Sequence, residues 1–134
     1  MIVVDTDVIA AFWIKTARTD LAHRARRRDA DWIAPLLWRS EMRSVLRQYL
    51  THDLLAYADA LWTAEKAEAM LAGQEYAVRT PAVLKLVERT GHSAYDCEFV
   101  ALAEAQGVPL VTGDRRLAER FPQVAMILED FVQG

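Results

Sequence analysis

Four acidic residues, Asp5, Glu41, Asp96 and Asp114, occupy positions from which their carboxylates could act together. Asp5 directly follows an apolar Ile-Val-Val run, and Asp114 follows a Pro-Leu-Val-Thr-Gly segment, so both lie at or just beyond the carboxyl end of a predicted buried strand. In open α/β sheets this edge is where ligands bind. Asp114 taken alone also fits the N-cap of a helix that follows a strand.

The other two acids belong to predicted helices. Glu41 lies three residues after Trp38, at the edge of an apolar stripe, where it either pairs with a neighbouring arginine or faces a ligand. Asp96 precedes Phe99 by three residues, which places it on the apolar face of its helix, where a carboxylate is costly unless it is paired or bound to a metal. The segment from Ser93 to Asp96 also has the form of a capping box, which explains the acid equally well.

The combination of the four acids is harder to explain by local roles. Two come from strand ends and two from the first turns of helices that follow loops, and these regions of a parallel sheet converge on one edge. Carboxylates gathered there repel one another unless divalent cations neutralise them. Ligation by oxygen without His or Cys selects Mg²⁺ or Mn²⁺ rather than zinc. We therefore expect Asp5, Asp96, Asp114 and Glu41 to form a metal site.

Short apolar runs alternate with longer helical stretches along the whole chain, without a repeat or a flexible linker. This pattern predicts a parallel sheet covered by helices on both faces, which is an α/β fold. The predicted strands span residues 2–4, 32–34, 109–112 and 124–128. The predicted helices span residues 8–15, 20–27, 36–50, 54–71, 80–91, 93–107 and 114–120, with Thr80 as the N-cap of the fifth and Ser93 opening the sixth.

Composition limits the remaining possibilities. With 134 residues, of which 53 % are hydrophobic and 26 % charged, the chain is expected to form a single packed domain, residues 1–134. Its one cysteine, Cys97, excludes an intramolecular disulfide and a cysteine-based zinc cluster. No apolar run reaches the roughly 18 residues that span a bilayer, and the first residues lack a basic secretion signal. We expect a soluble, cytoplasmic protein without a membrane partner.

Four segments together resemble the PIN domain, and within it the VapC-type toxins of bacterial toxin–antitoxin pairs. They are Ile-Val-Val-Asp-Thr-Asp-Val at 2–8, Ser-Glu-Met at 40–42, Ser-Ala-Tyr-Asp-Cys-Glu-Phe-Val-Ala-Leu-Ala at 93–103 and Leu-Val-Thr-Gly-Asp-Arg-Arg-Leu at 110–117. The resemblance covers nearly the whole chain in order. Its most specific part is the Tyr-Asp helix followed by Leu-Val-Thr-Gly-Asp.

The resemblance implies a PIN-like (Rossmann-like) α/β/α sandwich with a short central parallel sheet. It also implies a metal-dependent endoribonuclease that leaves a 5′-phosphate and a 3′-hydroxyl, a homodimer, and neutralisation by a small cognate VapB-like antitoxin. The metal-binding acids of the family map by position onto the same four residues, and Thr6 and Thr112 match its hydroxyl positions near the metal.

Two positions depart from the family pattern. The residue two after the first acid is commonly Asn or Ser, whereas here it is Asp7, which either adds a carboxylate to the cluster or caps the first helix. Some members of the family have a further acidic or amide group shortly after the last acid, whereas here Arg115 and Arg116 follow Asp114. A second metal ion would therefore have few oxygen ligands. The number of metal ions therefore stays open.

The net charge of −3 hides a clustering of the basic residues, of which 13 of 16 are arginine. Because arginine is the better planar partner for phosphate, Arg24, Arg27, Arg28 and Arg115 are expected to guide an RNA backbone. A solvated helix face is the alternative explanation for the first three. Single-stranded or looped RNA is the expected substrate, since its backbone can bend into the site.

Two other functions fit parts of the pattern. The segment Val-Val-Asp-Thr-Asp-Val has the form of the nucleophile motif of haloacid-dehalogenase-like phosphatases, with Asp5 attacking and Asp7 as acid and base. Against it, the chain is short and no suitably placed lysine precedes Gly113. A catalytically silent PIN module that only binds RNA or protein is the other alternative, and the intact set of acids argues against it.

Overall fold

Five short parallel strands form the centre of the structure, a computed structural model that describes residues 1–134. The strands are β1 (Ile2–Val4), β2 (Trp32–Pro35), β3 (Glu75–Tyr76), β4 (Leu110–Thr112) and β5 (Ala125–Ile127). Their order across the sheet is β3-β2-β1-β4-β5, and every pair of neighbours is parallel. β1 therefore lies in the middle of the sheet, between β2 and β4.

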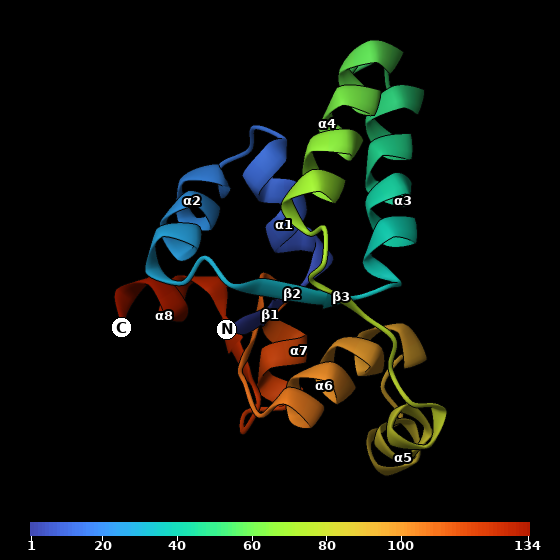
Figure 1. Ribbon diagram of the computed structural model, residues 1–134, viewed down its shortest axis with the longest axis vertical. Helices are drawn as coiled ribbons and strands as arrows, with labels where there is room; N and C mark the ends of the chain where they lie inside the picture. Colours follow the sequence, from blue (N-terminus) through green and yellow to red (C-terminus); the bar gives the residue numbers. More distant parts are fainter.

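Helices cover both faces of this sheet (Figure 1). In the figure, α1 (Thr6–Trp13), α2 (Thr19–Arg28), α3 (Trp38–Thr51) and α4 (Tyr57–Met70) lie above it. Below it lie α5 (Thr80–Thr90), α6 (Ala94–Gln106) and α7 (Arg115–Arg120). The last helix, α8 (Leu128–Gln133), packs beside α2. The observed α/β/α sandwich is the fold class that the alternation of strands and helices predicts. No helix combines the length and the apolarity that crossing a membrane requires.

The sheet register brings the carboxyl ends of the central strands together. Val3 of β1 pairs with Ile33 on one side and with Leu110 on the other, and all three side chains are fully buried. The backbone N–H of Asp5 extends the ladder by donating to the carbonyl of Val111 at 3.0 Å. Helices cover both sides of β1 and β4, so the residues of these two strands are apolar nearly to their carboxyl ends. The first polar side chains appear where the two strands end.

The predicted elements are confirmed to within a few residues, with two omissions and one misplaced cap. β3 was missed because it has only two residues, both half-buried. α8 is not among the predicted helices, and its first residue, Leu128, falls in the predicted last strand, although Leu128, Phe131 and Val132 have helical spacing. The N-cap of α5 is Arg79, without a side-chain bond, and Thr80 is the first helical residue, so the prediction of Thr80 as a cap is wrong.

α3 and α4 form an antiparallel pair that stands away from the sheet (Figure 1). α4 packs through small residues, of which Ala60, Thr63 and Ala67 are buried. Its large apolar side chains face solvent instead: Tyr57 is 71 % and Trp62 55 % exposed. α4 therefore contributes less to the core than its apolar composition indicates.

Candidate metal centre

Asp5 joins the central strand to the first helix. As the N-cap of α1, its Oδ1 accepts a hydrogen bond from the Thr6 N–H at 2.8 Å, while Oδ2 accepts one from the Thr112 hydroxyl at 2.7 Å. The side chain is only 7 % exposed. Burial raises the pKa of Asp5 well above its ordinary value, and the charge of Asp7 adds to this rise, while the two hydrogen bonds oppose it. Asp5 is thus a buried carboxyl group that forms no ion pair with a basic side chain.

Thr112 connects Asp5 to the second acid at the strand ends. Its hydroxyl donates to Asp5 and accepts a hydrogen bond from the backbone N–H of Asp114 at 3.0 Å. Asp114 is the N-cap of α7, because its Oδ1 accepts from the N–H groups of Arg116 and Leu117 at 2.9 and 3.3 Å. The cap interpretation of Asp114 is therefore correct, and its Oδ2 accepts no hydrogen bond and is free for a further partner.

Glu41 lies in the first turn of α3 and faces the start of α1. Its Oε1 accepts a hydrogen bond from the hydroxyl of Thr6 at 2.7 Å. The pairing with an arginine that its position allowed does not form. Burial raises the pKa of Glu41, while the hydrogen bond from Thr6 lowers it and the negative charges of Asp96 and Asp7 raise it further. Both threonines singled out by the family pattern, Thr6 and Thr112, thus orient a carboxylate.

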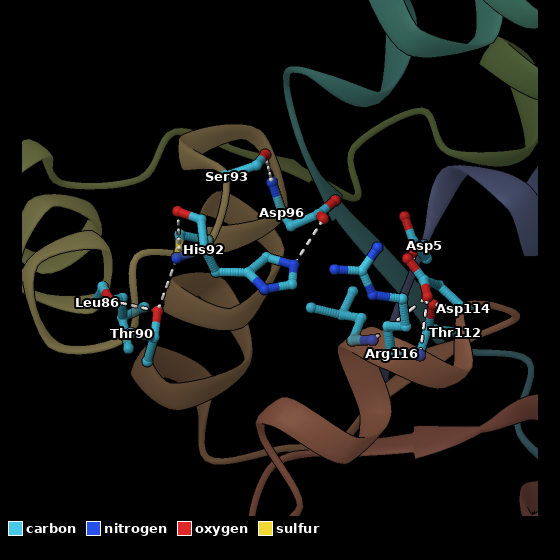
Figure 2. A network of polar contacts seen from close by, with 11 residues as sticks. Asp5, Leu86, Thr90, His92, Ser93, Asp96, Thr112, Asp114 and Arg116 are labelled. Atoms are coloured by element: carbon cyan, nitrogen blue, oxygen red, sulfur yellow. Dashed lines mark hydrogen bonds and ion pairs between the residues drawn. The ribbon is translucent and has the colours of Figure 1, made fainter.

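Asp96 approaches from the opposite face of the sheet, in the first turn of α6. Its backbone N–H donates to the hydroxyl of Ser93 at 3.2 Å, which is one half of the predicted capping box. The Asp96 carboxylate does not complete the box, because its Oδ2 accepts from Nε2 of His92 at 2.9 Å. Figure 2 shows this half-buried carboxylate pointing across the gap towards Asp5 and Asp114.

Asp7 holds the turn before Asp114 in place. Its Oδ1 accepts from the Gly113 N–H at 3.1 Å. The guanidinium of Arg18 donates to the Gly113 carbonyl at 3.0 Å and to both carboxylate oxygens of Glu129, at 2.7 and 2.8 Å. Desolvation by the surrounding protein raises the pKa of Asp7, while the Gly113 bond and the charge of Arg18 oppose this rise. The helix cap is Asp5, so the alternative role of Asp7 as a cap is wrong.

We predict that Gly113→Ala disturbs this turn. The added Cβ would stand 2.6 Å from Oδ2 of Asp7 and 2.8 Å from Nη1 of Arg18, so both side chains must move. We expect a loss of about 1–2 kcal/mol in the free energy of unfolding, measured by urea denaturation, because overpacking strains the turn. In an Asp7→Ala background the same change should cost less, since the nearest atom is gone. Equal costs in both backgrounds would contradict the contact.

One open pocket of about 390 Å³ collects three of the four predicted acids. Its lining residues are Asp5, Thr6, Asp7, Glu41, Ser44, Val45, Gln48 and Asp114. Asp96 is not part of the lining, although its charge raises the pKa of both Asp5 and Glu41. No three acidic, His or Cys side chains are arranged closely enough to hold one ion as they stand.

The chemistry of the donors nevertheless fits a hard divalent cation. All the donors are carboxylate oxygens, and Asp5, Glu41 and Asp114 form no ion pair with any basic side chain. Asp96 has only the His92 imidazole as a partner. Several carboxylates at the rim of a buried strand edge, without a counter-charge, are the ligand set that Mg²⁺ or Mn²⁺ prefers.

His92 and Arg18 also contribute to the site, although the sequence did not predict a role for either residue. His92 orients Asp96, and its spacing of four residues from Asp96 is the one sequence signal that points to this contact. Arg18 acts on the Gly113 turn across 95 residues of chain, and no local pattern indicates that contact. The predicted guiding residues Arg24, Arg27 and Arg28 are exposed on α2 and do not line the acidic pocket, and Arg115 is exposed at the start of α7.

Comparisons with known proteins agree with this architecture. The sequence profile of the PIN domain matches residues 2–122. Ribonuclease VapC3 of Pyrobaculum aerophilum is 33 % identical over 90 % of this chain and 95 % of its own length. Ribonuclease VapC9 of Mycobacterium tuberculosis strain H37Rv is 39 % identical over 63 % of this chain and 66 % of its own.

A solved structure supports the fold independently of close sequence similarity. The crystal structure of PAE2754 from Pyrobaculum aerophilum superposes with a TM-score of 0.75, over 98 % of this chain and 93 % of that one, at 21 % identity. The family profile and the VapC3 relative confirm the resemblance inferred from four short segments over nearly the full length of the chain. The chain belongs to the PIN domain family, and within it to the VapC-type proteins.

Proposed function

We propose that the protein is an endoribonuclease toxin that hydrolyses RNA phosphodiester bonds with Mg²⁺ or Mn²⁺. The observation that carries this proposal is the grouping of Asp5, Glu41, Asp96 and Asp114 around one sheet edge, none of them paired with an arginine or lysine, in a chain of the VapC-type group. Asp5, Asp96 and Asp114 would hold the ion, with Glu41 as a direct ligand or one acting through water.

The contacts of the acids indicate which residues would bind the ion and which would orient the ligands. A bound divalent ion would lower the pKa of a water molecule and neutralise charge on the scissile phosphate. The Thr112 and Thr6 hydroxyls fix the orientations of Asp5 and Glu41, and His92 fixes that of Asp96. The protein's own contribution is thus to present preoriented oxygen atoms at a concave, solvent-accessible edge where an RNA backbone can enter.

The experiment that tests the proposal is cleavage of a pool of single-stranded RNA, mapped at nucleotide resolution. We expect cleavage with Mg²⁺ or Mn²⁺, none in EDTA, and products that carry 5′-phosphate and 3′-hydroxyl ends. Absence of cleavage under all these conditions would support a silent binding module instead. Hydrolysis of a small phosphate ester with a burst of phospho-aspartate at Asp5 would support the haloacid-dehalogenase-like alternative.

We further propose that a small VapB-like antitoxin neutralises the activity and that two copies of the chain form a homodimer. The VapC names of the relatives support the first proposal, because VapC-type proteins are paired with VapB partners. Exposed apolar side chains on α4, Tyr57, Leu61 and Trp62, offer surface for either contact. Light scattering of the chain alone, and with the product of a short neighbouring reading frame, tests both.

A further inference from the structure

A second, wholly polar pocket lies between the loop from α5 to α6 and helix α7. Its volume is about 490 Å³, and no hydrophobic residue lines it. The lining residues are Thr90, Gly91, His92, Arg116, Glu119 and Arg120. This pocket is separate from the acidic pocket and shares no lining residue with it.

The charge of this pocket is predominantly positive. Arg116 and Arg120 are one helical turn apart on α7, both are exposed, and neither forms an ion pair with a carboxylate. Arg120 donates one hydrogen bond to the backbone carbonyl of Thr90, which leaves most of its donors free. Glu119 is the one acidic residue in the lining, so two guanidinium groups face a single carboxylate.

The polar pocket borders the proposed metal centre through two residues. His92 lines it and also donates to the carboxylate of Asp96. Arg116 lines it and donates its backbone N–H to Asp114. Figure 2 shows the guanidinium of Arg116 extending into the space between His92 and Asp96 on one side and Asp114 on the other. An RNA chain bound across the acids would therefore come next to this pocket.

We propose that the polar pocket binds a backbone phosphate of single-stranded RNA, next to the phosphate that is hydrolysed, through Arg116 and Arg120. This inference rests on the proposed ribonuclease function. Guanidinium groups present planar pairs of donors that match phosphate oxygens, and two of them in one pocket fix the path of the backbone. The bound phosphate would position the adjacent one over Asp5, Asp96 and Asp114.

The lining favours RNA over a protein segment as the occupant. Protein partners are anchored mainly by aromatic and aliphatic side chains in apolar pockets, and this pocket has no apolar wall. Recognition of an unpaired RNA strand through its backbone requires only a positively charged groove. The apolar surface for a protein lies elsewhere, on α4.

The test measures binding in EDTA, where RNA is not cut, so that it is independent of hydrolysis. The fluorescence anisotropy of a labelled single-stranded RNA pool is followed from low to moderate NaCl concentration. The double variant Arg116→Gln/Arg120→Gln should bind about tenfold more weakly at low salt, as expected for lost charge-assisted hydrogen bonds. The slope of the logarithm of the association constant against the logarithm of the NaCl concentration should become less negative by about 0.7. This change corresponds to the loss of one phosphate contact on single-stranded RNA.

Two control variants separate this site from general charge effects. Arg79→Gln removes one positive charge, against two in the double variant, at the other end of α5 and should leave affinity and slope near those of the original chain. Arg116→Lys/Arg120→Lys keeps both charges and should keep the slope while losing part of the affinity, because lysine lacks the planar pair of donors. Thermal melting checks that the variants, all altered at exposed positions, remain folded.

The proposal is overturned if the double glutamine variant binds with the original affinity and slope, if Arg79→Gln weakens binding equally, or if the original chain binds no RNA at low salt. A glutamine variant that loses affinity for a co-expressed antitoxin but not for RNA would assign the pocket to a protein partner and equally contradict it. If the original chain binds RNA as expected yet fails to cut it with Mg²⁺, the proposed function fails and the binding site stands.

Discussion

Asp5→Asn should lower the rate of RNA cleavage by at least about 100-fold, which is the upper end of the loss typical for residues that only support metal ligands. Asp5 ends the central strand, is almost fully buried, and has each carboxylate oxygen fixed by a hydrogen bond. Asparagine fills the same space but carries no negative charge, so it cannot hold a divalent cation in the same way. The measurement is single-turnover cleavage with Mg²⁺ in excess.

The matched control is Asp59→Asn, which makes the same chemical change at an exposed position near the tip of the α3–α4 hairpin. It should cleave at the original rate. Thermal melting of Asp5→Asn should show a cooperative transition, since one charge is lost and no cavity is created. Full activity of pure Asp5→Asn protein, or equal losses in both variants, would contradict the assignment of Asp5 as a ligand.

The arrangement of the fold could be predicted because its signals are local. Apolar runs that end in a polar residue mark buried parallel strands, and the helices between them carry stop signals such as Gly91 and Gly107, both with positive φ. β3 has no comparable signal, because two half-buried residues on a sheet edge need neither an apolar run nor a periodic pattern. Its place is fixed instead by contacts with β2 and α3, which join residues distant in sequence.

The acids of the site could be predicted from their positions at strand ends and first turns, but their partners could not. Asp96 has a sequence that favours a capping box, yet its carboxylate turns to His92, because the imidazole lies in the loop directly before the helix. The bond from Thr6 to Glu41 crosses between two helices, and that from Arg18 to Gly113 joins chain segments far apart. Such contacts depend on the three-dimensional packing and leave no mark on local spacing.

The crowding of acids has a consequence for stability as a function of pH. The folded-state pKa values of Asp5, Asp7 and Glu41 lie above their ordinary values, mainly because of burial. The folded chain therefore binds more protons than the unfolded chain at pH values above about 4, where unfolded carboxyl groups titrate. By linkage, the free energy of unfolding of the metal-free protein should fall as the pH rises through these raised pKa values.

Mg²⁺ should reverse this loss. At a Mg²⁺ concentration about 100 times its dissociation constant, binding to the folded state adds ~2.7 kcal/mol, which for a chain of this size raises the melting temperature by roughly 10 °C. The increase should be larger at pH 8 than at pH 5, because protons compete with the cation for ligands whose pKa is raised. Differential scanning fluorimetry in EDTA and in Mg²⁺, at matched ionic strength, measures both effects.

Glu41→Gln tests the role of a single carboxylate charge in this experiment. The Gln side chain can still accept the hydrogen bond from the Thr6 hydroxyl, so only the charge is lost. The metal-free variant should melt at a higher temperature than the original chain at pH 8, since repulsion with Asp96 and Asp7 is relieved, and its increase with Mg²⁺ should be smaller. Asp59→Asn should change neither value. If neither Mg²⁺ nor Mn²⁺ raises the melting temperature of the original chain at pH 8, the carboxylates at this sheet edge do not form a metal site.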